Sequence, residues 1–230
     1  MELKKVLIGL EGLKAKGNLD VEINNLDSNS KNIKEGDMFV AIKGFSTDGH
    51  KYINNAIKAG AKVVMVEEGA DLSSIELPDD VTVIMAKDTR EALAICSCNF
   101  YENPSKKFKL IGVTGTKGKT TTTFMIKEIL EKAGHKVGLI GTIATYINGR
   151  MVSESSRTTP ESIELQKTFA QMVEDGVEYV VMEVSSQSLK LHRVDGCAFD
   201  IVLFTNFSED HISEKEHPNM QDYFESKLKL

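Results

Sequence analysis

A glycine-rich stretch carries the residues whose types and spacing point most directly to chemistry: Gly115-Thr116-Lys117-Gly118-Lys119-Thr120-Thr121. Glycines let backbone N–H groups converge on phosphate oxygens, and a helix that begins here adds the positive end of its dipole. Lys119 would then reach the β- and γ-phosphates of a nucleotide, and the hydroxyl of Thr120 would take a Mg²⁺ position. Val113 stands where such loops usually have their first glycine. The strand before the motif and the helix after it still favour a phosphate loop over an ordinary turn.

Two further polar segments follow apolar runs of strand length: Glu183-Val184-Ser185-Ser186 after residues 179–182, and Thr205-Asn206 to Asp210-His211 after residues 201–204. In open parallel sheets the site lies beyond the carboxyl ends of the strands, so both segments are expected beside the phosphate loop. An acidic side chain in the position of Glu183 reaches Mg²⁺ in phosphate-loop enzymes. Taken alone, His211 would be an ordinary surface residue, and its place beyond a strand of the same sheet makes it a candidate ligand.

The elements that position these groups form two predicted α/β domains, residues 1–105 and 106–230, divided at a polar, turn-rich segment around Pro104. In the first domain, short apolar runs predict strands at 38–42, 63–66 and 81–85. Helical spacing predicts helices at 51–59 and 88–100, the first of which ends at Gly60.

The second domain is predicted to alternate strands and helices. Strands are expected at 109–113, 137–147, 179–182 and 201–204. One helix begins at Thr120 and ends at Gly134, with Ile126, Ile129, Leu130 and Ala133 buried. A second helix begins with Thr159 as its cap and Pro160 at the first helical position, and it packs through Leu165, Phe169, Met172 and Val173. The continuous apolar runs predict a parallel sheet with helices on both faces.

Composition excludes several classes of function. The net charge of −6 argues against non-specific nucleic-acid binding. Three cysteines fit a reducing cytoplasm better than a disulfide framework, and the pair Cys96 and Cys98 has no partner pair that would make a metal site. No segment approaches the ~20 apolar residues of a membrane span, and the first residues lack a secretory apolar region. A cytoplasmic protein that inserts into no membrane is expected.

Taken together, the motifs resemble those of the Mur ligases, a family of ATP-dependent enzymes that form amide bonds in peptidoglycan synthesis. The resemblance covers nearly the whole chain and rests on these segments: residues 115–121, the Glu183-Val184-Ser185-Ser186 strand end, Asn206 with Asp210-His211, Arg157-Thr158-Thr159-Pro160, residues 185–194, and Asn29-Ser30-Lys31 followed by residues 36–41. Within the family they look most like the branch that adds the third amino acid of the stem peptide. The first domain would then bind a uridine nucleotide, and the second would be an incomplete ATPase domain.

The resemblance implies a role for each matching residue. Ser30 would bind the uridine nucleotide, flanked by Phe45, Ser46 and Thr47, and the muramoyl peptide would be held by Arg157, Thr158, Thr159, Ser185 and Arg193. Residues 115–121 would bind ATP, and Thr120, Glu183, His211 and Lys227 would surround Mg²⁺. Lys119, Glu183, His211 and Lys227 form the implied catalytic set, in which Lys227 matches a lysine that the family carbamylates into a metal ligand. From its local sequence alone, Lys227 is instead expected to be a solvated helix lysine.

The implied reaction transfers the γ-phosphoryl group of ATP to the terminal carboxylate of UDP-MurNAc-L-Ala-D-Glu, after which the amine of a diamino acid attacks the acyl phosphate. The family has a further C-terminal domain for the incoming amino acid, whereas this chain ends at Leu230. We therefore expect a fragment that binds its substrates but does not ligate them.

Some residues depart from the family pattern. Asn29 and Lys31 replace the common Asp and Arg, Gln187 and Leu191 stand where His and Gln are common, and residues 212–213 read Ile-Ser where Leu-Asp is common. Two alternatives stay open: another Mur or folylpolyglutamate-type ligase, and a non-catalytic module that binds nucleotide and precursor. An ordinary phosphate-loop kinase or GTPase has no support, because the guanine-reading N-K-x-D motif is absent.

Overall fold

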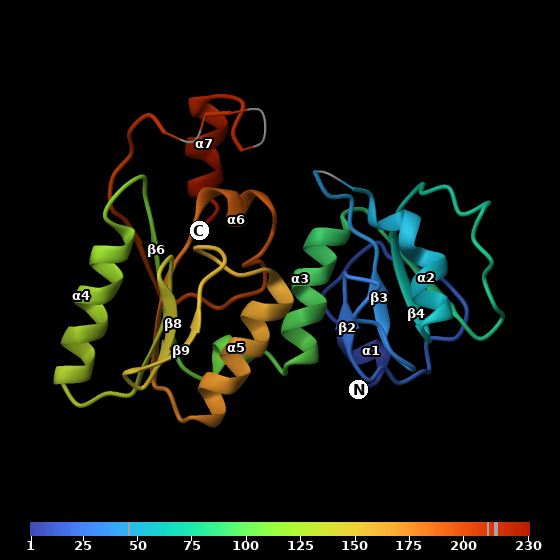
Figure 1. Ribbon diagram of the computed structural model, residues 1–230, viewed down its shortest axis with the longest axis horizontal. Coiled ribbons are helices and arrows are strands. Elements are labelled where there is room, and N and C mark those ends of the chain that lie inside the picture. The colour runs from blue at the N-terminus through green and yellow to red at the C-terminus, as the bar shows by residue number, and fades with distance from the viewer. Residues whose placement is uncertain (46, 211, 214–215) are drawn as a thin grey trace. The chain divides into compact units, whose positions relative to one another are not determined.

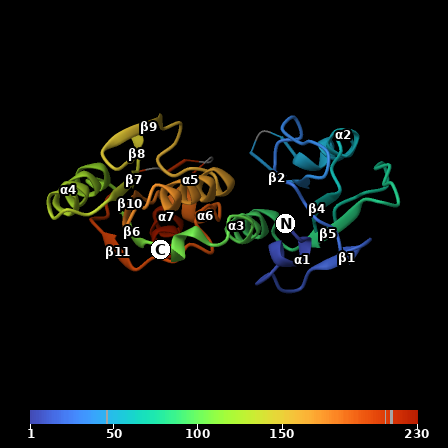
Figure 2. The same cartoon turned by 90° about the horizontal axis from the view of Figure 1, so that it is seen from below.

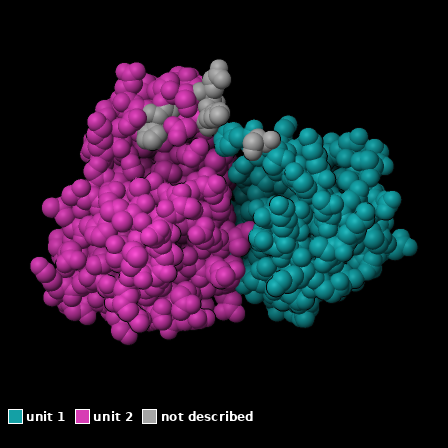
Figure 3. Space-filling model, viewed as in Figure 1, with its two compact units in different colours: residues 1–100 teal, residues 101–230 magenta. Residues whose placement is uncertain are grey.

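The structure is a computed structural model that describes residues 1–45, 47–210, 212–213 and 216–230. Its chain divides into two compact units, Met1–Phe100 and Tyr101–Leu230, here called unit 1 and unit 2 (Figure 3). Each unit has its own sheet and its own apolar core. Within the described ranges, no helix is long and apolar enough to cross a bilayer.

Unit 1 is built on a five-stranded sheet in the order β1-β5-β4-β3-β2. The strands are β1 (Lys14–Lys16), β2 (Leu26–Asp27), β3 (Met38–Val40), β4 (Val63–Glu67) and β5 (Thr82–Ala86). Strands β2 to β5 are parallel, and β1 is antiparallel to β5. The helices are α1 (Leu3–Val6), α2 (Ile53–Lys58, after the 3₁₀ turn η1, Gly49–Tyr52) and α3 (Thr89–Phe100). The strands and helices predicted for this unit are confirmed, and Gly60 follows α2 with a φ of +107°.

Unit 2 begins with the 3₁₀ turn η2 (Pro104–Lys106) and is built on a six-stranded sheet in the order β11-β6-β10-β7-β8-β9 (Figure 2). The strands are β6 (Lys109–Thr114), β7 (Val137–Ile140), β8 (Ala144–Ile147), β9 (Arg150–Glu154), β10 (Tyr179–Glu183) and β11 (Ile201–Phe204). The first four in that order are parallel, as the sequence predicts, and β8 and β9 extend the sheet in the antiparallel sense. The carboxyl ends of β6, β7 and β10 therefore lie next to one another, at the same end of the sheet.

Two long helices cover opposite faces of this sheet, α4 (Lys119–Lys132) and α5 (Ser162–Glu174) (Figure 1). Under α4, Ile126 and Leu130 pack on Ile111, Val113 and Val181. Under α5 lies a larger core that contains Leu165, Phe169 and Met172, all fully buried as predicted. Two shorter helices, α6 (Ser186–Lys190) and α7 (Met220–Lys227), pack on each other (Figure 1).

Three local predictions for unit 2 are wrong. The strand expected over 137–147 is two strands, because the chain turns at residues 141–143 and returns as antiparallel β8. The second helix begins at Ser162 with Glu161 as its N-cap, not at Thr159, since the Thr159 hydroxyl is committed elsewhere. On α4, Ile129 and Ala133 are exposed, because only the stripe through Ile126 and Leu130 faces the sheet.

Strand β11 also differs from the prediction of burial on both faces. Ile201, Val202 and Phe204 are between 40% and 54% exposed. The reason is topological: β11 pairs only with β6 and forms the edge of the sheet. An apolar run predicts a strand, but its burial depends on what packs against it.

Candidate active site

The loop between β6 and α4 has the conformation of a phosphate loop. Gly115 has a φ of +139°, and a Cβ there would collide with the hydroxyl of Thr205. Gly118 has a φ of +84° and caps α4, with open space around it. Gly115 thus allows the backbone to approach Thr205 closely, whereas Gly118 provides the left-handed backbone conformation at the start of α4. Lys117, Gly118 and Thr121 are exposed, so the outer side of the loop and the first turn of α4 face solvent.

Residues after β11 hold this loop in place. The Asn206 side chain accepts a hydrogen bond from the Lys117 backbone N–H at 3.0 Å and donates one to the Lys117 carbonyl at 2.9 Å. The Thr205 hydroxyl donates to that same carbonyl at 2.8 Å. The Thr116 backbone N–H donates to the Asn206 carbonyl at 3.0 Å. These four hydrogen bonds hold Thr116 and Lys117 of the loop against the segment that follows β11.

Lys119 lies over the loop that precedes it. Its ammonium donates to the carbonyls of Gly115 at 2.8 Å and Thr116 at 3.1 Å. Burial lowers the pKa of Lys119, against the opposing influence of Glu183 and Asp210. The side chain of Lys119 is therefore held against the backbone of the loop.

Glu183, at the end of β10, is a buried carboxylate that faces the first turn of α4. The Thr120 hydroxyl donates to its Oε2 at 3.0 Å, and the Thr142 backbone N–H donates to its Oε1 at 3.0 Å. A side chain on Gly141 would collide with this carboxylate, so the turn at 141–143 is shaped around it. Thr120 and Glu183, predicted to lie together, do so.

A row of threonine hydroxyls continues from Glu183 toward a pocket. The Thr142 hydroxyl donates to Glu183 at 3.2 Å and lies 3.0 Å from the Thr158 hydroxyl. Thr159 lies behind the row and is fully buried. Its hydroxyl donates to the Glu183 carbonyl at 2.9 Å and accepts from the Ser185 backbone N–H at 3.0 Å. Thr159 therefore fixes the strand end and is not accessible to a ligand, although the sequence predicts it in the substrate site.

Two arginines share one carboxylate beside this row. Glu161 pairs with Arg157 at 2.8 Å and with Arg193 at 2.9 Å. Arg193 is only 5% exposed, and it also donates to the Thr159 carbonyl at 3.3 Å. Glu161 therefore holds the guanidinium groups of Arg157 and Arg193 together on one side of the row.

Lys227, on α7, is 2% exposed, so the expectation of a solvated helix lysine is wrong. Its ammonium donates to the Gly115 carbonyl at 3.0 Å, the same oxygen that Lys119 contacts, and lies 4.5 Å from the centre of the Tyr223 ring. Burial and, secondly, the charge of Lys119 lower the pKa of Lys227 to about 8, although Asp210 acts in the opposite sense. The Tyr223 hydroxyl donates to Thr116 at 3.2 Å, which ties α7 to the phosphate loop.

One pocket of about 210 Å³ collects many of these side chains. Its lining residues are Lys119, Arg157, Thr158, Ser185, Ser186, Gln187, Arg193, Glu216, His217 and Lys227. Among the described lining residues are four long cationic side chains and one carboxylate, and Glu161 pairs with two of the cations, Arg157 and Arg193. Cationic side chains still outnumber carboxylates in this part of the pocket, which favours an anionic ligand. It includes Arg157, Thr158, Ser185 and Arg193, all predicted to hold the substrate.

The candidates in unit 1 lie on two loops. Ser30 follows β2, in a turn where Asp27 accepts from the Asn29 backbone N–H at 2.7 Å. Phe45, 70% exposed, and Thr47 follow β3. Because β2 and β3 are parallel neighbours, both loops lie at the same end of their sheet. Their uridine-binding role stays a prediction, and Ser46 lies outside the described residues.

The donor set for a divalent cation is also partly in place. The Glu183 carboxylate and the Thr120 hydroxyl offer hard oxygen donors of the kind Mg²⁺ prefers. Over the described part of the chain no group of three or more His, Cys, Asp or Glu side chains could hold a metal. His211, the predicted histidine ligand, lies outside the described residues.

Several residues of the site were missed by the sequence analysis. Thr142 and Glu161 had a weak signal, a polar interruption in an apolar run and an acid between two predicted site residues. Ser186 lies in a polar segment that the sequence places beside the loop, but no role was predicted for it. His217 and Tyr223 were given no role either, because their contacts are made between segments far apart in the chain.

Comparison with known proteins relates both units to one family. Residues 113–230 match the Mur ligase middle domain, and residues 22–101 match the catalytic domain of the Mur ligase family. The UDP-N-acetylmuramoyl-L-alanyl-D-glutamate--2,6-diaminopimelate ligase of Clostridium tetani is 51% identical over 230 residues, which are 100% of this chain and 46% of that protein. The ligase of the same name from Bacillus licheniformis is 43% identical over 231 residues, which cover 100% of this chain and 45% of that protein. The chain spans about half the length of the curated relatives it matches.

Solved structures share the fold. The structure of a UDP-N-acetylmuramoyl-L-alanyl-D-glutamate--2,6-diaminopimelate ligase superposes with a TM-score of 0.81 at 20% identity, covering 100% of this chain and 44% of its own. The structure of MurF from Acinetobacter baumannii superposes with a TM-score of 0.57 at 19% identity, covering 90% of this chain and 40% of its own. At these identities the likeness concerns the fold alone.

Proposed function

The chain belongs to the Mur ligase family, and from that membership we propose that this protein is an ATP-dependent ligase that joins a carboxylate to an amine. The carboxylate substrate is UDP-MurNAc-L-Ala-D-Glu, and the amine is a diamino acid. Relatives of 43–51% identity are named as ligases of 2,6-diaminopimelate, which makes that compound the first amine to test. Because the reaction consumes ATP, we place it in the cytoplasm.

One observation carries the proposal: a continuous row of side chains joins the phosphate loop to the cationic pocket. Thr120 contacts Glu183, Glu183 contacts Thr142, and Thr142 lies 3.0 Å from Thr158 in the pocket. A nucleotide on the loop and a carboxylate in the pocket would therefore lie on either side of Lys119. That is the placement that phosphoryl transfer between them needs.

Each side chain then has a defined task. Lys119 would neutralise charge on the phosphoryl group as it moves to the peptide carboxylate. Arg157, Arg193 and Ser185 would orient the peptide. Thr120 and Glu183 would hold Mg²⁺, which when bound would neutralise phosphate charge at this edge of the sheet.

We also propose that Lys227 reacts with carbon dioxide to form a carbamate. The neutral amine is the nucleophile in that reaction. At about pH 7 a pKa of about 8 leaves roughly one lysine in ten neutral, against about one in 3,000 for an ordinary lysine. A carbamate is an oxygen donor near the loop, whereas an ammonium would repel a divalent cation.

Binding is tested on the 230-residue chain by calorimetric titration with MgATP and with the uridine-muramoyl dipeptide. Turnover is tested on the protein expressed from its complete gene, by phosphate release with the dipeptide and diaminopimelate. The proposal predicts binding of both ligands and phosphate release that depends on both substrates. Binding of both without release would favour a non-catalytic module. Failure to bind the uridine precursor would favour another ligase of the folylpolyglutamate type.

A further inference from the structure

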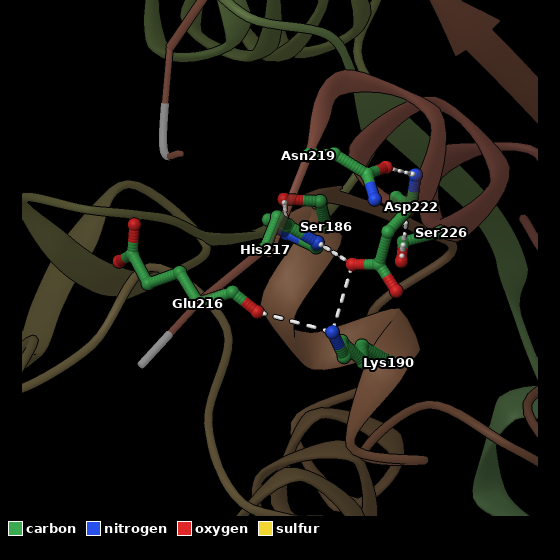
Figure 4. Close-up of polar contacts among 7 residues, drawn as sticks. All are labelled: Ser186, Lys190, Glu216, His217, Asn219, Asp222 and Ser226. Atoms are coloured by element: carbon green, nitrogen blue, oxygen red, sulfur yellow. Dashed lines mark hydrogen bonds and ion pairs between the residues drawn. The ribbon is translucent and has the colours of Figure 1, made fainter. Parts of the chain in front are cut away.

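A polar cluster connects α6 with the segment that ends in α7 (Figure 4). His217 is fully buried; its Nδ1 lies 2.6 Å from Asp222 Oδ2, and its Nε2 lies 2.9 Å from the Ser186 hydroxyl. The Lys190 ammonium donates to the same Asp222 oxygen at 2.7 Å and to the Glu216 carbonyl at 3.2 Å. Ser186 and Lys190 belong to α6, and Asp222 belongs to α7. The cluster therefore joins the two helices at both ends of α6.

The cluster resembles a Ser-His-Asp triad in its distances, but its environment argues against a nucleophilic serine. In such a triad the carboxylate interacts with the histidine and raises its basicity. Here Lys190 shares the same oxygen of Asp222 and competes for its charge. Partial burial raises the pKa of Asp222, but its bonds with Lys190 and His217 outweigh this and lower it. The carboxylate thus stays ionised between two donors, which suits a mechanical link.

The two helices that it joins carry groups from both sides of the candidate active site. α6 follows directly on Glu183 and Ser185, at the carboxyl end of β10. α7 carries Tyr223 and Lys227, which contact the phosphate loop. Within α7, the Ser226 hydroxyl donates to the Asp222 carbonyl at 2.7 Å, and the Asn219 side chain caps the helix (Figure 4). The helix therefore moves as a unit with Asp222.

We propose that Ser186, Lys190, His217 and Asp222 form a clamp that positions Lys227 against the phosphate loop. Ser186 and His217 also line the pocket, whereas Lys190 and Asp222 are not among its lining residues. The role assigned to all four is positioning, because their hydrogen bonds reach Lys227 through α7. Its importance for catalysis rests on the proposed function, whereas its effect on the position of Lys227 does not.

Substituting His217 by Asn or Gln tests separately the two hydrogen bonds that its ring nitrogens make. An Asn side chain can place its amide near Nδ1 and keep the bond to Asp222, which is internal to the α7 segment. A Gln side chain can place its amide near Nε2 and keep the bond to Ser186, which crosses to α6. If the clamp positions Lys227, His217→Gln should keep Lys227 in place, because it keeps the bond to Ser186. His217→Asn and Ser186→Ala should both release Lys227, because each breaks that bond. A role in packing alone also makes His217→Asn worse than His217→Gln, because Asn leaves the larger cavity. It predicts no effect of Ser186→Ala, which removes only a hydroxyl, so that variant separates the clamp from packing.

The first readout is the rate at which an amine-reactive ester labels Lys227 in the 230-residue chain, measured at fixed pH by peptide mass spectrometry. Exposed Lys132 serves as the internal reference. We expect His217→Asn and Ser186→Ala each to raise the labelling of Lys227 by roughly five- to tenfold, and His217→Gln to raise it by less than about twofold. The double variant Ser186→Ala with His217→Asn should add nothing further, because both changes break one bond.

The control is His135→Gln, at another histidine of unit 2, which lies between α4 and β7, pairs with Glu178 at 3.5 Å and packs against the Tyr179 ring. It should leave the labelling of Lys227 unchanged. Circular dichroism establishes that each variant is folded. Equal labelling in wild type, His217→Asn and Ser186→Ala would overturn the clamp, as would equal effects of the Asn and Gln variants.

The second readout is steady-state phosphate release by the protein expressed from its complete gene. His217→Asn should lower kcat about tenfold or more while KM for ATP stays within about twofold, since the loop that binds the nucleotide is untouched. His217→Gln should restore most of kcat. If the wild type releases no phosphate, the proposed function fails while the labelling result still decides the clamp. A variant in which Lys227 is labelled faster but kcat is unchanged would refute the catalytic part of the inference.

Discussion

Replacing Lys227 by methionine should make the chain more stable at neutral pH. The structure places an ammonium in a site that is 2% exposed and beside a second ammonium, that of Lys119. Methionine keeps the length of the apolar stem without the charge. It also leaves no unpaired acceptor, because Lys119 still donates to the Gly115 carbonyl at 2.8 Å.

The magnitude follows from the change in pKa. A fall from 10.5 to about 8 means that keeping Lys227 charged in the folded chain costs roughly 3 kcal/mol. The contact with the Tyr223 ring at 4.5 Å offsets about 1 kcal/mol of this. Lys227→Met should therefore raise the free energy of unfolding by about 2 kcal/mol at about pH 7.

The pH dependence gives the sharper test. In the unfolded chain Lys227 keeps its proton up to about pH 10.5, whereas in the folded chain it loses the proton near pH 8. Between these two pH values the unfolded state therefore binds more protons than the folded state. The wild type should therefore gain stability as the pH rises through this window, whereas the penalty is fully present below pH 8. From about pH 7 to about pH 9.5 the advantage of Lys227→Met should shrink by about 2 kcal/mol.

The assay is urea unfolding of the wild type and Lys227→Met at both pH values, with Lys132→Met at an exposed site as the matched control. Other groups titrate equally in all three proteins, so the difference between wild type and variant isolates Lys227. Parallel pH dependence of wild type and Lys227→Met would refute the burial argument. A variant less stable than the wild type at both pH values would do the same.

Three further substitutions probe the phosphate loop and the row of hydroxyls. Thr142→Val removes one hydroxyl bond to the buried Glu183 carboxylate and should lower the free energy of unfolding by roughly 1.5–3 kcal/mol, whereas Thr142→Ser should keep most of it; urea denaturation decides. Asn206→Ala removes both side-chain bonds to Lys117 and should weaken MgATP binding by about tenfold in calorimetry, so unchanged affinity would mean that the loop holds its shape unaided. Gly115→Ala combines a φ of +139° with a steric collision and should lower the midpoint of thermal unfolding and abolish nucleotide binding, and a fully binding variant would contradict the assigned loop geometry.

Local sequence predicted the groups whose conformation is set within a few residues. The phosphate loop was found from its glycines, because only glycine readily adopts the backbone that Gly115 and Gly118 require. Glu183 was found because a polar residue directly after an apolar run must lie at the end of a strand, and the parallel order of β6 and β10 then brings it to the loop. The α/β class followed from the same runs.

Tertiary structure alone decided which of the remaining residues are buried and what they contact. Lys227 looks like a solvated lysine in its own segment, yet it donates to a carbonyl 112 residues away, and its lowered pKa follows from that burial. Thr159 looks like a helix cap, but the return of β10 gave its hydroxyl a better-placed partner. His217 gave no signal at all, since its two partners come from different helices. The physical reason is common to all three: spacing along the chain encodes backbone conformation, whereas desolvation and charge depend on neighbours that only the folded chain brings together.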